Sequence, residues 1–143
     1  MEPEPAHLRD WLREHPLPDT AFVQTVAGIA ARALAGDDFW VAVREFLDEF
    51  ALLQTDAQRA RAISDPPPLT GDAGQDAYVA ALAEHLAATS RIPRPAWTVD
   101  GRFLDRFWFV SSVRGFRALA LVESPAAFRR RGIFISAGSL RRC

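Results

Sequence analysis

The sequence predicts a mainly α-helical fold, a single compact domain with an aromatic-rich core. Two observations favour it. Apolar residues recur at spacings of three and four along residues 22–89, the period of a helix face. Asp, Gly and Pro, which cap or end helices, bound these stretches. The chain has 143 residues, of which 49% are apolar and 24% charged, values typical of an ordinary soluble domain with one core.

Residues 19–63 predict an acidic helical hairpin and a short further helix. Asp19 is a suitable N-cap for the first helix, and Gly36 is placed to end it. Asp37 or Asp38 would cap the second helix. We interpret the aromatic stripe of this hairpin as core packing, and a groove for a partner is the alternative.

The rest of the chain divides at a Pro- and Gly-containing loop over 64–74, which precedes a helix expected over 75–89. Residues 1–18 hold four prolines and predict a flexible arm with a short amphipathic turn. We therefore expect one domain over 19–143, in which 75–143 forms a helix and an Arg-rich C-terminal part.

Dense aromatic residues mark the expected centre of the core. Trp97 would close that core from the side, and the central residues are Phe103, Leu104, Phe107, Trp108 and Phe109.

The C-terminal part predicts a helix, a basic turn and a short apolar segment. Ser111 or Ser112 would cap a helix that runs to about residue 123, and a Ser–Pro pair starts the next turn. In that turn we expect Phe128 to face inward and Arg129–Arg131 to face outward. Residues 133–135 suit a brief strand, for which the sequence offers no obvious partner strand.

Charge is distributed unevenly along the chain. Residues 1–90 carry 6 Arg against 15 acidic residues, whereas residues 91–143 carry 11 Arg against 3, and Lys is absent. One interpretation is that the two halves neutralise each other within the fold. The other is that the basic half binds an acidic partner or a nucleic acid, for which Arg is well suited.

Composition also limits the expected location. No apolar run approaches the roughly 18 residues of a membrane span, and the acidic N-terminus does not resemble a secretory signal. The one cysteine, Cys143, cannot form a disulfide within the chain, which favours a reducing cytoplasm.

Sequence signatures of catalysis are missing. His7, His15 and His85 have no metal-ligand spacing, and a phosphate-binding loop of the GxxxxGK type would need a lysine. No GxSxG motif occurs. We therefore predict neither an enzyme nor a bound cofactor or metal.

Nucleic-acid binding is a second hypothesis. The acidic hairpin would repel DNA, which argues against its use as a helix-turn-helix. The basic half could instead contact an acidic partner or phosphates through five arginines: Arg114, Arg117, Arg129, Arg130 and Arg131.

The segment from Leu119 to Leu140, LALVESPAAFRRRGIFISAGSL, follows the motifs Arg94-Pro-Ala-Trp97 and Phe107-Trp-Phe109. Together they resemble the C-terminal part of a group of small actinobacterial proteins, over about residues 91–140. Some members are fused to a helix-turn-helix module, which this chain lacks. Genes of the group tend to lie beside predicted nucleotidyltransferase-type toxins, so the resemblance implies an antitoxin role.

The leading hypothesis is therefore a non-enzymatic protein-interaction module, antitoxin-like, that binds and neutralises a partner protein. The arginines would meet acidic metal-binding carboxylates of a nucleotidyltransferase-type toxin. A nucleic-acid-binding transcriptional regulator is the alternative, and a small enzyme or ligand-binding domain is a third. The sequence does not indicate an oligomeric state.

Overall fold

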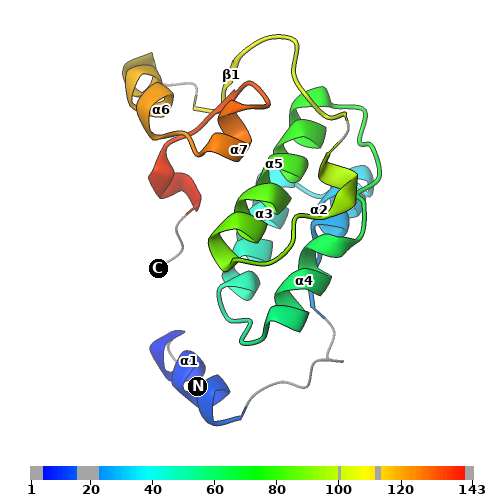
Figure 1. The fold of residues 1–143 in the computed structure, drawn as a ribbon, viewed down its shortest axis with the longest axis vertical. Coiled ribbons are helices and arrows are strands. Elements are labelled where there is room, and N and C mark those ends of the chain that lie inside the picture. The colour runs from blue at the N-terminus through cyan, green and yellow to red at the C-terminus, as the bar shows by residue number, and fades with distance from the viewer. Residues whose placement is uncertain (1–4, 16–22, 100, 112–113, 141–143) are drawn as a thin grey trace.

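The computed structural model describes residues 5–15, 23–99, 101–111 and 114–140, and these are mainly helical, as predicted (Figure 1). The α-helices are α1 (Pro5–Glu14), α2 (Val26–Leu34), α3 (Phe39–Phe50), α4 (Asp56–Ser64), α5 (Ala73–Ser90), α6 (Arg117–Glu123) and α7 (Ala126–Arg129). Short 3₁₀ helices are η1 (Ala96–Thr98), η2 (Arg114–Phe116) and η3 (Ala137–Leu140). The strands are β1 (Trp108–Phe109) and β2 (Ile133–Phe134).

Side-chain caps define where the N-terminal helices begin. Thr25 Oγ1 accepts a hydrogen bond of 3.0 Å from the Gly28 N–H at the start of α2, and Asp38 Oδ1 accepts one of 3.0 Å from Val41 at the start of α3. Asp38 is one of the two caps that the sequence predicted for this helix. Gly36, at φ +106°, makes the left-handed turn between these helices. The predicted cap Asp19 lies outside the described residues.

Helix α5 is the centre of the fold, because it is surrounded by other elements (Figure 1). It packs against α2, α4, η1 and α7. Apolar residues are buried around most of its circumference, which is typical of a helix enclosed on all sides. One contiguous core cluster then joins residues from Val23 to Ile135. The predicted hairpin and the C-terminal part therefore share one core.

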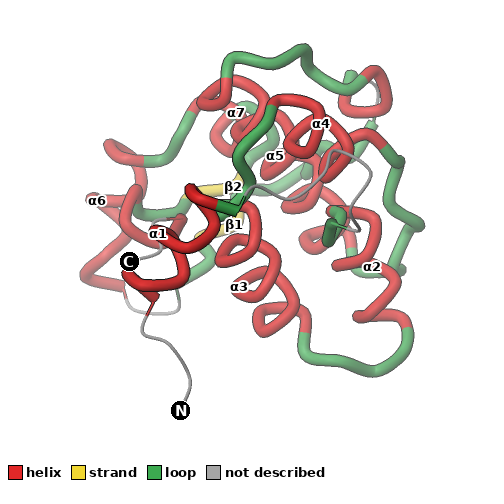
Figure 2. Tube along the Cα trace, turned by 90° about the horizontal axis from the view of Figure 1, so that it is seen from below, coloured by secondary structure: helices red, strands yellow, loops and turns green. Residues whose placement is uncertain are grey.

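A two-stranded parallel ladder joins α7 to the rest of the C-terminal part. Trp108 pairs with Ile133 and Phe109 with Phe134, so β1 is the partner strand that the sequence did not reveal. The ladder lies between α6 on one side and the helices α3 and α5 on the other (Figure 2). Gly132, at φ +82°, turns the chain from α7 into β2.

The predicted centre of the core was wrong in part. Leu104 and Trp108 pack against the core, but Phe103 and Phe107 are exposed, Phe107 by 75%. The physical reason is that α5 already supplies a fully enclosed apolar helix, so the aromatic segment covers its side instead of filling the centre. Trp97 does lie at the flank, where its Nε1–H donates to the Ile63 carbonyl at 3.0 Å.

Two further expectations changed in detail. Helix α6 begins at Arg117 behind η2, so Ser111 does not cap it, and Ser112 lies outside the described residues. Ser124 is buried and does not cap α7. Its hydroxyl donates to the Ile133 carbonyl at 3.0 Å, which ties the start of α7 to β2.

At the N-terminus, α1 replaces the short turn that was expected in the arm. The Trp11 ring stacks on His15 with centroids 4.6 Å apart, and Trp11 remains 53% exposed.

Candidate interaction surface

Helix α6 presents apolar side chains to solvent. Of its residues only Ala120 is buried, whereas Leu119, Leu121 and Val122 are exposed, Val122 by 79%. Phe116, directly before the helix, is also exposed. A helix that is apolar on all sides is normally enclosed, and adjacent exposed apolar residues are typical of protein-interaction sites. We call Phe116, Leu119, Leu121 and Val122 the α6 surface.

A groove lies between α6 and the strand ladder. Its volume is about 300 Å³, and its lining comes from β1, η2, α6, β2 and η3. Phe109 and Phe134 form its floor, stacked with ring centroids 5.1 Å apart. The Arg117 guanidinium lies over the Phe109 ring at 5.3 Å, so the groove carries a cation beside its apolar floor. We call this cavity the α6 groove.

The α6 groove adjoins a second cavity of about 200 Å³ against α3. Val110, Ile135 and Ser139 line both cavities, so the two lie side by side. Arg44 borders the second cavity as Arg117 borders the first. Among the described residues that line the pair, these arginines are the charged ones, and none is acidic. The combined surface is therefore apolar with positive charge beside it.

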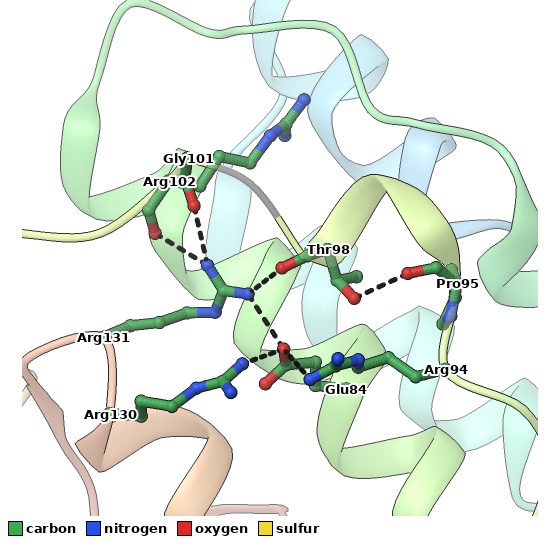
Figure 3. A network of polar contacts seen from close by, with 8 residues as sticks. All are labelled: Glu84, Arg94, Pro95, Thr98, Gly101, Arg102, Arg130 and Arg131. Atoms are coloured by element: carbon green, nitrogen blue, oxygen red, sulfur yellow. Dashed lines mark hydrogen bonds and ion pairs between the residues drawn. The ribbon is translucent and has the colours of Figure 1, made fainter.

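A second cationic feature surrounds Glu84 of α5. Three guanidinium groups converge on Glu84 Oε1, from Arg94, Arg130 and Arg131 (Figure 3). Nη2 of Arg131 lies 3.1 Å from that oxygen and Nη1 of Arg94 lies 3.5 Å from it. We call these four residues the arginine cluster. It joins one carboxylate of the acidic half to three arginines of the basic half, so part of the charge is neutralised inside the fold.

Arg131 is fully buried, and the prediction that it faces outward was wrong. Its side chain has 0% exposure and donates to the carbonyls of Thr98, Gly101 and Arg102, as well as to Glu84 (Figure 3). Four acceptors replace the water around its two Nη atoms, whereas the buried Nε has no hydrogen-bond partner among the described residues. Burial lowers the pKa of Arg131 from its ordinary value, and the nearby Glu84 carboxylate partly opposes that change. Arg131 is therefore a structural residue, inaccessible to a partner.

The other predicted arginines are distributed over the surface. Arg117 borders the α6 groove, whereas Arg130 belongs to the arginine cluster. Arg129 is exposed and donates to the Ser124 carbonyl at 2.8 Å. Arg114 begins η2, but its side chain lies outside the part that the structure describes. Although they are close in sequence, Arg117, Arg130 and Arg131 therefore serve different places in the fold, the α6 groove for the first and the arginine cluster for the other two.

The α6 surface was missed by reasoning from sequence. The signal was present in the run from Leu119 to Val122, which has no polar position to form an outer face. The sequence predicts a helix for this run, but the spacing of apolar residues does not show whether another element covers that helix.

Other kinds of site receive no support from the described residues. Among them, no group of three or more His, Cys, Asp or Glu could hold a metal ion. Nor is any of the described helices long and apolar enough to cross a bilayer. No family model matches the chain, and comparisons with curated proteins and with solved structures found no match either.

Proposed function

We propose that this protein is a non-enzymatic interaction module that binds a partner protein through the α6 surface and the α6 groove. The observation that carries the proposal is the exposure of Leu119, Leu121 and Val122 on a short helix beside an apolar groove. Leaving such side chains in water forgoes roughly 1.5–3 kcal/mol for each large one, which a partner would recover by covering them.

The partner segment that fits this surface is apolar and carries acidic side chains. Arg117 and Arg44 border the two adjoining cavities, and the described lining residues offer no acidic group. A carboxylate on the partner would therefore meet a guanidinium, while its apolar side chains would occupy the floor formed by Phe109 and Phe134.

An antitoxin-like role is the form of this function that the sequence resemblance suggests. In that form the module neutralises a toxin by covering its active site, and a nucleotidyltransferase-type toxin would present acidic metal-binding carboxylates. Of the five arginines predicted to make such contacts, Arg117, Arg129 and Arg130 are exposed, and among these three Arg117 lines the α6 groove. We do not propose Arg131 as a contact residue, because its side chain is buried.

Co-expression with the product of the adjacent gene, followed by size-exclusion chromatography with mass determination, tests this function. We expect a stoichiometric complex that persists at about 0.5 M salt, because apolar burial is only weakly screened. A protein that elutes alone would contradict the proposal. So would affinity for DNA or RNA that falls steeply with salt, since counterion release is the mark of a phosphate-binding regulator.

A further inference from the structure

A further cavity of about 290 Å³ lies between the end of α5 and α7, and none of its lining residues lines the α6 groove. Its charged lining residues are Glu84, Arg94 and Arg130, and its apolar lining consists of Ala87, Ala88, Ile92, Ala126 and Ala127. The two arginines are about half exposed, at 47% and 48% of their side-chain surface, so both can reach a ligand from solvent.

The charges at this cavity do not balance. Arg131 is buried and pairs with Glu84, so these two residues neutralise each other. Arg94 and Arg130 then contribute two positive charges without a carboxylate of their own, because among the described residues Glu84 is the acidic partner of both. Guanidinium groups held close together repel one another, and an added anion would relieve that repulsion.

Glu84 uses only a few of the hydrogen-bond donors of these arginines. Three guanidinium groups share the single oxygen Oε1 of Glu84, which has two lone pairs, and Arg94 is held at the long distance of 3.5 Å. Each guanidinium carries five N–H donors, of which Arg94 and Arg130 each direct one to Glu84. Both side chains line the cavity and are about half exposed, so an oxygen acceptor that enters from solvent could reach their other donors.

We propose that Arg94 and Arg130 form a binding site for a small phosphate monoester, whose organic group packs on the alanines of α5 and α7. A phosphate monoester carries a charge near −2 at neutral pH and three acceptor oxygens, which match two guanidinium groups and their free donors. A monocarboxylate would neutralise one of the two charges. The site shares no lining residue with the α6 groove, and its test needs no protein partner.

Titration calorimetry at constant ionic strength tests the site with three probes: inorganic phosphate, propyl phosphate and acetate. We expect saturable binding of inorganic phosphate, and propyl phosphate should bind at least about threefold more tightly because its chain buries apolar surface. Acetate should bind about tenfold more weakly than phosphate, because it lacks the second charge. Equal affinity for acetate, or no saturable phosphate binding, would overturn the proposal.

Three variants locate the binding. Arg94→Gln and Arg130→Gln should each weaken phosphate binding about tenfold or more, since each removes charge-assisted hydrogen bonds. Arg129→Gln is the matched control, because Arg129 is an exposed neighbour that does not line the cavity. It should change affinity by less than about twofold. An equal loss of phosphate affinity in Arg129→Gln would show that phosphate responds only to the general surface charge, which would contradict a specific site. Thermal unfolding confirms that each variant is folded.

Discussion

Glu84 and Arg131 are 47 residues apart in the chain and form an ion pair of 3.1 Å inside the protein (Figure 3). Glu84 comes from the central helix α5, whereas Arg131 follows α7 at the turn into β2. The same Arg131 side chain also holds the carbonyls of the loop around Thr98 and Gly101. One buried guanidinium therefore joins α5, the loop after η1 and the strand ladder that carries the α6 groove.

Glu84→Gln should destabilise the fold strongly. The substitution keeps the size of the side chain but leaves the charge of Arg131 buried without a counter-charge. Removing one partner of a buried pair costs about 3–5 kcal/mol. We expect a loss of that order in the free energy of unfolding, measured by urea denaturation. A loss below about 1 kcal/mol would show that Arg131 is adequately satisfied by the carbonyls of its loop.

Replacing both members of the pair should cost less than the single changes predict. In Glu84→Gln/Arg131→Met no buried charge remains, and the methionine occupies the volume of the arginine stem. We expect a coupling energy of about 1–3 kcal/mol in a double-mutant cycle built from urea unfolding. Strictly additive losses would mean that the two side chains stabilise the fold independently.

Gly132→Ala should destabilise the turn between α7 and β2. Gly132 has φ +82°, and an added Cβ would lie 3.5 Å from Leu104 Cβ, so the strain comes from the backbone rather than from a clash. The left-handed region costs a non-glycine residue about 1–2 kcal/mol. Thermal or urea unfolding measures this loss. Gly138→Ala is the control, since nothing lies within 4 Å of its added Cβ, and it should be near neutral. Equal effects would contradict the account of the turn.

We expect the stability of the fold to depend on pH because of His85 in α5. Burial lowers the pKa of His85 from its ordinary value of 6.5, so the unfolded chain takes up the proton more readily than the folded one. Stability should therefore fall as pH drops below about 6.5 and level off below the folded pKa, with a slope of no more than about 1.4 kcal/mol per pH unit. Urea unfolding between pH 7.5 and 5 measures it.

The His85→Gln variant provides the comparison, because it removes the titrating imidazole and leaves every other titrating group in place. The stability of the unaltered protein should decrease relative to that of the variant as pH falls. A constant difference between the two proteins, or one that changes in the opposite direction, would contradict a pKa lowered by burial.

Local chemistry made much of the helical part predictable. The stripe of α3, the cap Asp38 and the turn at Gly36 all follow from residues within a few positions of one another. The short further helix expected at the end of 19–63 corresponds to α4, and the helix expected over 75–89 corresponds to α5. For α3 the period and the cap agree, whereas the caps Thr25, Thr55 and Asp72 of α2, α4 and α5 were not predicted.

The C-terminal part depended on contacts that are distant in sequence. Ile133 pairs with Trp108 in the strand ladder, and Arg131 forms its ion pair with Glu84, 47 residues away in the chain. Spacing along the chain cannot distinguish a buried arginine from its exposed neighbours Arg129 and Arg130. The same limit explains the candidate site, since the sequence predicts a helix there but does not show that its apolar side chains are exposed.

The most direct test of the interaction surface is a comparison of Val122→Asp with Leu69→Asp. Both side chains are exposed, at 79% and 66%, so each change should alter the free energy of unfolding by less than about 0.5 kcal/mol. Leu69 lies in the loop before α5, away from the α6 surface, and serves as the matched control.

The measurement is the mass of the complex formed on co-expression with the adjacent gene product, determined during size-exclusion chromatography. We expect the unaltered protein and Leu69→Asp to form a stoichiometric complex, and we expect Val122→Asp, although folded, to form none. A complex that Val122→Asp forms as readily as Leu69→Asp would contradict the role of the α6 surface.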